Sequence, residues 1–163
     1  MATRRRPSAT PVGDAYEVAV RYLGNRPRTV AEIHRHLRSK RFDDPAIATA
    51  IDKLRAQRYV DDEAFARWWL EQRDRFRPRS DRALRTELAQ KGVARDVVDL
   101  VFGERAPDAD VEQARRALSR PLARWATLPD AERKRKIHAF LVQRGFDYDV
   151  IDDVIRREVT DEA

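Results

Sequence analysis

The chain contains no cysteine, one methionine and only five glycines in 163 residues. The absence of cysteine excludes disulfide bonds and thiolate metal sites, and it fits a reducing compartment. No apolar run approaches the roughly 20 residues that cross a bilayer. Arg4-Arg5-Arg6 is not followed by the apolar segment of a secretory signal. We therefore expect a cytoplasmic protein with no membrane partner.

Patterns typical of catalysis and cofactor binding are also missing. The sequence has no glycine-rich phosphate loop, and its three histidines are too scattered for a metal cluster. Paired acids lie at expected helix starts or on solvent-facing positions, where helix capping explains them better than acid–base chemistry. These pairs are Asp43-Asp44, Asp61-Asp62 and Asp152-Asp153. The sequence predicts a protein that is not an enzyme and that binds no cofactor or metal.

Charge is abundant: 38% of the residues are Asp, Glu, Lys or Arg, and the net charge is +6. A basic balance favours a polyanionic partner or surface. Arg4, Arg5 and Arg6 account for part of this excess, so the remainder of the chain is less basic than the total indicates.

Five apolar positions recur three times along the chain. The second set lies 51 positions after the first, and the third lies 53 positions after the second. Such self-similarity is typical of a helical repeat array, in which each unit buries its apolar face against its neighbours. The three sets are Ile33, Leu37, Phe42, Ile47 and Ile51; Leu84, Leu88, Val93, Val98 and Phe102; and Ile137, Leu141, Phe146, Ile151 and Ile155.

A short turn recurs in the same register, as Lys40-Arg41-Phe42, Lys91-Gly92-Val93 and Arg144-Gly145-Phe146. Helices commonly end where the next residue adopts the left-handed conformation, which glycine reaches without a Cβ clash. Gly92 and Gly145 fit this position. Because Arg41 does not, we expect the first turn to be strained or differently shaped.

The predicted fold is all-α, with three tandem three-helix repeats. We expect Asp44 to cap a helix that has Pro45 at its first position, and Pro121 to interrupt a helix. A stripe that includes Trp68, Trp69 and Phe76 is interpreted as core. The expected segments are a disordered basic arm (1–13), repeat 1 (14–60), repeat 2 (61–105), repeat 3 (106–159) and a tail (160–163).

Basic side chains form two candidate contact surfaces for an acidic protein or for phosphates: an arginine strip over Arg73–Arg85 in the second repeat and a cluster at Arg133–Lys136 in the third. Solvated helix faces explain isolated clusters of this kind equally simply, and the helix dipole alone accounts for a lysine at a helix C-terminus. Arg82 and Arg85 are expected to point away from Leu84 and Leu88, where their replacement leaves the core intact. The candidates are Arg73, Arg75, Arg77, Arg79, Arg82, Arg85, Lys91, Arg133, Arg135 and Lys136.

Three motifs together resemble the RecX family of recombination regulators, over roughly residues 14–158. The resemblance implies an elongated, curved array of three three-helix units, which we expect to be monomeric. It also implies binding to the RecA recombinase filament, inhibition of its ATP hydrolysis and strand exchange, a role in DNA repair and the SOS response, and some direct affinity for single- or double-stranded DNA. The motifs are Arg58-Tyr-Val-Asp-Asp-Glu-Ala-Phe-Ala66, Thr86-Glu-Leu-Ala-Gln-Lys-Gly-Val93 and Phe140-Leu-x-x-Arg-Gly-Phe146.

A second hypothesis is a DNA-binding transcription regulator, in which residues 29–60 form a helix-turn-helix followed by a wing. A wing requires a β-hairpin, whereas Asp61-Asp62-Glu63 is typical of a helix start. The threefold repetition also has no role in such a domain.

Overall fold

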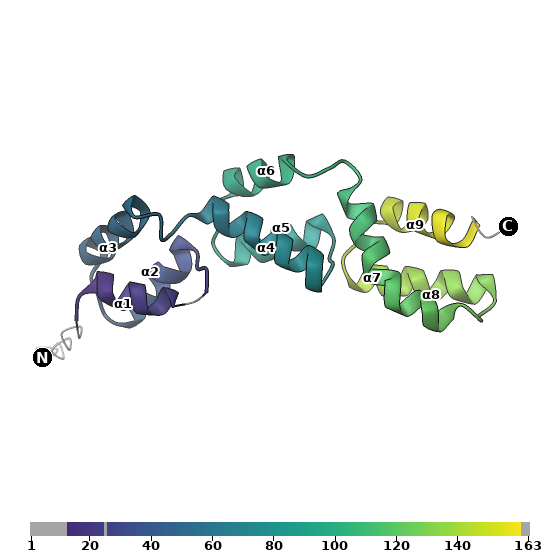
Figure 1. The fold of residues 1–163 in the computed structure, drawn as a ribbon, viewed down its shortest axis with the longest axis horizontal. Helices are drawn as coiled ribbons and strands as arrows, with labels where there is room; N and C mark the ends of the chain where they lie inside the picture. The colour runs from purple at the N-terminus through teal and green to yellow at the C-terminus, as the bar shows by residue number, and fades with distance from the viewer. Residues whose placement is uncertain (1–12, 25, 161–163) are drawn as a thin grey trace, which may run out of the picture. The chain divides into compact units, whose positions relative to one another are not determined.

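The computed structural model describes residues 13–24 and 26–160, and within these residues it contains nine α-helices and no strand (Figure 1). The predicted all-α array of three-helix repeats is confirmed. The expected basic arm, apart from Gly13, and the last three residues of the tail lie outside the described residues. The helices are α1 (Ala15–Leu23), α2 (Val30–Ser39), α3 (Asp44–Ala56), α4 (Asp62–Phe76), α5 (Asp81–Gln90), α6 (Arg95–Gly103), α7 (Ala109–Trp125), α8 (Asp130–Gln143) and α9 (Tyr148–Thr160).

Side-chain caps begin several of these helices where the sequence predicts them. The Thr29 hydroxyl accepts from the Glu32 amide at 3.1 Å, and the Glu32 carboxylate accepts from the Thr29 amide, which completes a capping box. The Ser80 hydroxyl accepts from the Ala83 amide at the start of α5. One predicted cap is wrong by a residue: Asp43, not Asp44, caps α3, because its carboxylate reaches the Ala46 amide at 2.9 Å.

The recurring apolar positions form the cores, and all of them are buried except Ile155, which is partly buried. Residues 33, 84 and 137 are fully buried, as are residues 37, 88 and 141. The first repeat buries its set against α1, and the third buries its set against α7. The repeat spacing of 51 and 53 residues therefore marks the positions at which the second and third helices of each repeat pack into its core.

The prediction that Pro121 interrupts a helix is wrong, because α7 continues to Trp125. Proline in a helix interior removes an amide donor and costs about 3 kcal/mol. Here Leu118 is fully buried before the proline, and Leu122 and Trp125 pack on the third core after it. Burial on both sides of Pro121 offsets the backbone cost.

The aromatic residues of α4 do not all belong to the core, although the sequence predicts that they do. Phe65 is buried and Trp69 is half-buried, but Phe76 is 65% exposed. The buried face of this helix instead runs through Ala66 and Leu70. Phe76 lies at the last position of α4, directly before the Arg77–Ser80 segment that leads to α5.

All three recurring turns share one left-handed backbone conformation, with φ of 69° at Arg41, 80° at Gly92 and 85° at Gly145. The first turn is therefore strained and not differently shaped. Close packing explains why only the later two carry glycine. A Cβ added at Gly92 would overlap the Cβ of Ala31, and one added at Gly145 would lie 3.0 Å from the Ser80 hydroxyl. Arg41, at the equivalent position of the first turn, is exposed.

The chain divides into two compact parts: the first runs to Phe65 and includes Lys91–Val93, and the second comprises Ala66–Gln90 and Ala94 onward. In the first, the Val30 amide donates to Asp62 at 2.8 Å, and the Thr29 hydroxyl donates to the Lys91 carbonyl at 2.7 Å. The start of α2 is thus completed by residues that follow it by more than thirty positions.

The second compact part repeats this arrangement at the start of α5. The Asp81 amide donates to Asp110 at 2.8 Å, and Asp110 belongs to the first turn of α7. Burial raises the pKa of Asp110 from 3.8 to about 6, although the hydrogen bond from Asp81 opposes the shift. Burial also raises the pKa of Asp62 in the equivalent position. In both cases an aspartate of the following repeat caps the second helix of the preceding one.

Candidate anion-binding surface

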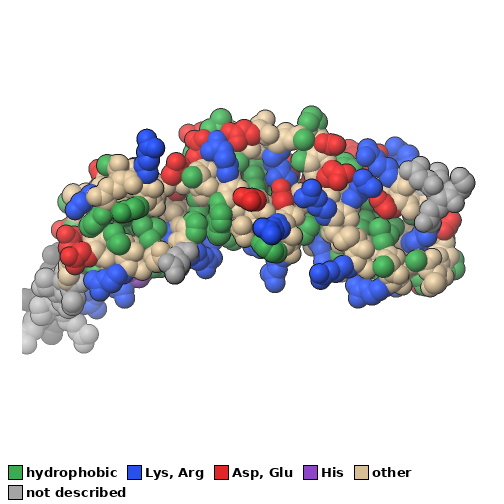
Figure 2. All heavy atoms as spheres, viewed as in Figure 1, with side chains coloured by type: hydrophobic (Ala, Val, Ile, Leu, Met, Phe, Trp, Pro, Cys, Tyr) green, Lys and Arg blue, Asp and Glu red, His purple; other side chains and the backbone are tan. Residues whose placement is uncertain are grey.

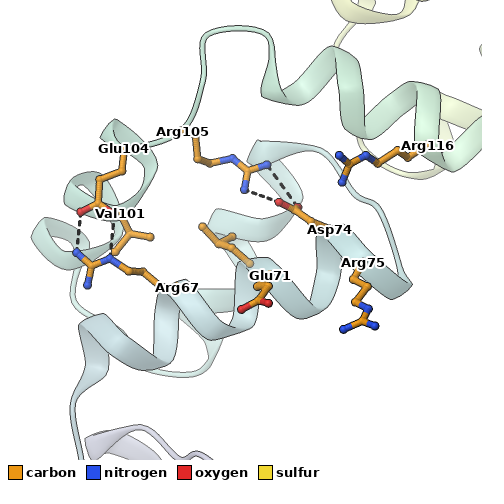
Figure 3. A pocket seen from close by; sticks show the side chains of 9 residues that line it. Arg67, Glu71, Asp74, Arg75, Val101, Glu104, Arg105 and Arg116 are labelled. Carbon is orange, nitrogen blue, oxygen red and sulfur yellow. Dashed lines mark hydrogen bonds and ion pairs between the residues drawn. The ribbon is translucent and has the colours of Figure 1, made fainter.

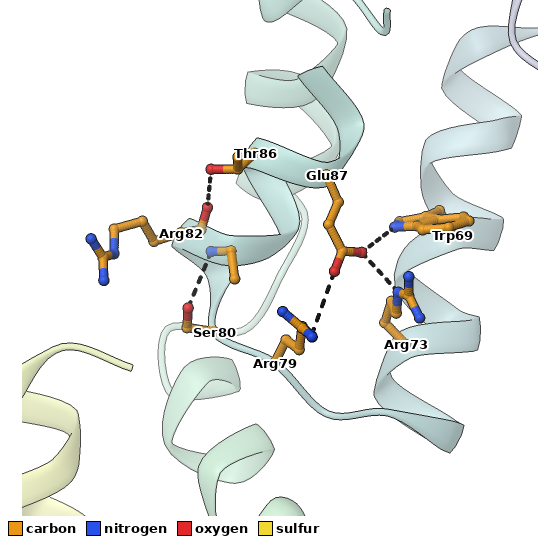
Figure 4. Close-up of polar contacts among 8 residues, drawn as sticks. Trp69, Arg73, Arg79, Ser80, Arg82, Thr86 and Glu87 are labelled. Carbon is orange, nitrogen blue, oxygen red and sulfur yellow. Dashed lines mark hydrogen bonds and ion pairs between the residues drawn. The ribbon is translucent and has the colours of Figure 1, made fainter. Parts of the chain in front are cut away.

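The predicted arginine strip of the second repeat is not a row of free cations. The Glu87 carboxylate accepts from Arg73 at 2.8 Å and lies 3.6 Å from Arg79, and it also accepts from the Trp69 indole (Figure 4). The Arg73 guanidinium also lies over the Trp69 ring. Arg73 and Arg79 therefore have a structural partner that an incoming anion would have to displace.

Arg82 and Arg85 also have partners within the second compact part. Arg85 pairs with Asp99 at 2.5 Å, and its guanidinium lies 4.3 Å from the centre of the buried Phe102 ring. Arg82 donates to the Gly145 carbonyl and lies 3.5 Å from Asp147. The expectation that Arg85 is independent of the core is wrong, because its side chain covers Phe102.

Two further candidates have structural roles that explain their positions. Lys91 is paired with Glu32 at 3.2 Å. Burial opposes the effect, but the hydrogen bond from the Thr29 amide and the Lys91 ammonium together lower the pKa of Glu32. Arg133 is only 8% exposed and pairs with Asp130 at 3.1 Å, so it does not belong to the solvated α8 cluster in which the sequence places it.

The remaining candidates are exposed cations. Arg75 lies in the last turn of α4, Arg77 directly follows this helix, and Arg135 and Lys136 lie on α8. Among the described residues, no carboxylate pairs with any of these four side chains. Basic and acidic side chains are interspersed over the face shown in Figure 2, and they form no single continuous field. An anion would therefore meet local groups of cations.

One such group borders a hollow of about 480 Å³ in the second compact part (Figure 3). Arg67 closes one side through a two-point contact with Glu104, at 2.6 and 2.9 Å. Asp74 is held by Arg105 at 3.1 Å. Arg75 and Arg116 also line the hollow, one from the end of α4 and one from α7, and Figure 3 shows neither joined to a carboxylate. These two cations are available to an anion.

Arg116 begins a ridge that sequence reasoning missed. Arg116, Arg120 and Arg124 follow one another at four-residue spacing on α7, and all three are exposed. Residues at this spacing share one helix face. In the described part of the chain none has a carboxylate partner, whereas the adjacent Arg115 pairs with Glu112 and Glu158. The four-residue spacing is visible in the sequence, but the expected helix break at Pro121 places Arg120 and Arg124 in different segments.

The described residues hold no group of three or more His, Cys, Asp and Glu side chains that could bind a metal ion. None of their helices is both long enough and apolar enough to span a bilayer. The wing of the alternative hypothesis is also not formed, because residues 62–76 are the helix α4.

Comparison with known proteins identifies all three repeats. The family models for the first, second and third three-helix domains of RecX match residues 15–54, 61–101 and 108–155. The regulatory protein RecX of Chlorobium phaeobacteroides is 30% identical over 135 residues, 82% of this chain and 85% of the relative. That of Thermobifida fusca is 30% identical over 149 residues, 91% of this chain and 80% of the relative.

Solved structures share the fold. The crystal structure of RecX from Lactobacillus salivarius superposes with a TM-score of 0.76 at 22% identity, covering 88% of this chain and 93% of that one. A second crystal structure of a regulatory protein RecX gives 0.71 at 23% identity, covering 90% and 71%. With three matched domains and relatives aligned over most of its length, the chain belongs to the RecX family of regulatory proteins.

Proposed function

We propose that this chain is a non-enzymatic regulator that binds the RecA recombinase filament on DNA in the cytoplasm and inhibits its ATP hydrolysis and strand exchange. Such an activity would modulate DNA repair and recombination. The observation that carries the proposal is the match of all three repeats to RecX domains, in order and over most of the chain.

The charges support a polyanionic partner. A filament of protein on DNA offers phosphates and acidic side chains along its length. Exposed cations without carboxylate partners bind these groups without first breaking an internal ion pair. Arg75, Arg77 and Arg116 satisfy this condition near the hollow, and Arg135 and Lys136 satisfy it on α8. Arg73 and Arg85 would first have to leave Glu87 and Asp99, so they contribute less to binding.

The test is a titration of the protein into a RecA recombinase assembled on single-stranded DNA, with ATP hydrolysis and strand exchange measured in parallel. We expect both activities to fall as the protein is added, and the effect to weaken as salt increases. Unchanged ATP hydrolysis and strand exchange, with circular dichroism showing a folded protein, would contradict the proposal.

Two double variants compare how much inhibition depends on cations without a carboxylate partner and on cations that lie near a carboxylate. Arg75→Ala with Arg77→Ala removes two exposed charges that have no carboxylate partner, whereas Arg95→Ala with Arg156→Ala removes two exposed charges that lie near Asp99 and Asp153. We expect the first pair to weaken inhibition about tenfold, equivalent to about 1.4 kcal/mol. The second pair should inhibit like the unmodified protein.

A further inference from the structure

We infer that the second compact part of the chain carries a binding site for single-stranded nucleic acid, with the backbone along the Arg116–Arg124 ridge and a base stacked on Phe76. This inference deepens the proposed function, because it assigns the surface of this chain that contacts DNA.

The ridge is suited to following a phosphate backbone. With a rise of 1.5 Å per residue, Arg116, Arg120 and Arg124 span about 12 Å along α7, enough for two or three consecutive phosphates. All three side chains are exposed, and no carboxylate among the described residues pairs with them. Binding therefore requires no internal ion pair to break.

Phe76 supplies the second element of the site. An exposed phenylalanine alone indicates little, because single apolar side chains are common on protein surfaces. Here the ring is 65% exposed between Arg75 and Arg77, and the Arg75 guanidinium lies 5.1 Å from the ring centre. An aromatic face flanked by cations is the usual platform on which proteins stack an unpaired base while holding its phosphates.

The two elements are connected. Arg75 lies against Phe76 and also lines the hollow, and Arg116, the first residue of the ridge, lines the same hollow. A strand can therefore pass from the aromatic ring, across the hollow, to α7. Because a stacked duplex does not present a base face to the protein, Phe76 favours a single strand.

Three acids line the hollow on this path: Glu104 is paired with Arg67, and the other two have different effects. Arg105 neutralises Asp74 through two hydrogen bonds. Glu71 is exposed at the edge of the hollow and, among the described residues, has no cationic partner, so it repels a phosphate there. Glu71 thus provides a variant that should strengthen binding, which a purely destabilising substitution would not do.

The test measures binding of a fluorescently labelled oligothymidylate to the full chain by anisotropy, over a range of salt concentrations. Arg116→Ala with Arg120→Ala should weaken binding at least tenfold and lower the slope of log affinity against log salt by about 1.4, or about 0.7 for each phosphate contact. Phe76→Ala should weaken binding about tenfold and leave the slope unchanged. Glu71→Gln should strengthen it.

Arg95→Ala with Arg156→Ala is the matched control, because it removes two exposed charges of the same compact part, from α6 and α9, that lie outside the proposed site. We expect it to change affinity less than twofold, as for a long-range charge effect alone. Equal losses in the ridge and control variants would overturn the site. So would an unchanged affinity of Phe76→Ala, or stronger competition by polyglutamate than by unlabelled oligothymidylate, which would indicate an acidic protein partner.

Recombinase inhibition, measured on the same variants, keeps the two proposals distinguishable. If the unmodified protein inhibits the recombinase but does not bind oligothymidylate, the nucleic-acid site is wrong and filament regulation stands. If it binds oligothymidylate through the ridge and Phe76 but has no effect on the recombinase, the proposed function is wrong and the site stands. Because alanine is a strong helix former, we expect the variants with alanine at helical positions to stay folded, and circular dichroism verifies this.

Discussion

Replacing Gly92 with alanine tests the packing of one repeat on the next. Two effects add. The left-handed backbone at φ 80° costs a residue with a Cβ roughly 1–2 kcal/mol. The new methyl group would also overlap the Ala31 Cβ, and relieving such an overlap in a packed region typically costs about 1–3 kcal/mol. We expect a total loss of about 2–5 kcal/mol, which lowers the melting temperature by about 10 °C.

The equivalent turns supply controls for each effect. At Gly145 the backbone has the same conformation, but the nearest atom to an added Cβ is the Ser80 hydroxyl, a small group at the edge of a helix start. Gly145→Ala should therefore cost less than Gly92→Ala. At Arg41 the conformation is left-handed and the side chain is exposed, so Arg41→Gly should stabilise by up to about 1 kcal/mol, partly offset by the freedom glycine adds to the unfolded chain.

Urea unfolding followed by circular dichroism measures all three changes. The expected order of stability is Arg41→Gly, unmodified protein, Gly145→Ala and Gly92→Ala. The reasoning is refuted if Gly92→Ala unfolds at the same urea concentration as the unmodified protein, because the turn would then tolerate a Cβ against Ala31. A loss for Arg41→Gly as large as that for Gly92→Ala would show that backbone conformation alone does not govern these turns.

Three further predictions concern ionised groups. The pKa of Asp110 is raised to about 6 in the folded protein, so its contribution to stability is present at low pH and is lost as pH rises through 6. In urea titrations at a series of pH values between about 4 and 7, the free energy of unfolding of the unmodified protein should fall by on the order of 1–2 kcal/mol more than that of Asp110→Asn. Asp62→Ala removes the acceptor of the Val30 amide and should cost about 1 kcal/mol in the same unfolding assay, and an unchanged midpoint would mean that water replaces it. Arg85→Ala, which uncovers Phe102, should lower the free energy of unfolding by about 1 kcal/mol, whereas Arg77→Ala should change it by less than about 0.5 kcal/mol; equal effects would contradict the different roles of the two side chains.

Local and periodic features of the fold were predictable from the sequence. The apolar positions at 33, 84 and 137 are buried as expected, and the capping box at Thr29–Glu32 forms as its spacing predicts. These features depend on residues within a helical turn or on a period repeated three times. Pro121 shows the limit, because the backbone preference of proline is outweighed by burial of Leu118 and Trp125, which is a tertiary effect.

The candidate surface was harder to predict, because whether a cation is free depends on residues far from it in sequence. Arg73 meets Glu87 fourteen positions away, and Arg105 meets Asp74 thirty-one positions away. A count of arginines treats Arg73 and Arg75 alike, yet only Arg73 has a carboxylate partner in the described structure. The exposure of Phe76 at the end of α4 likewise depends on the tertiary arrangement, which helical spacing alone does not reveal.

The caps that join successive repeats determine how parts of this protein can be exchanged between relatives. The start of α2 is completed by Asp62 and by the Lys91 carbonyl, so a chimera joined at residue 60 would separate this helix from its native acceptors unless the incoming repeat supplied matching ones. The first compact part includes Asp62–Phe65 and Lys91–Val93. A transplantable module is therefore discontinuous in sequence, and a graft that keeps those two short segments with repeat 1 should fold better than one that follows the helix boundaries alone.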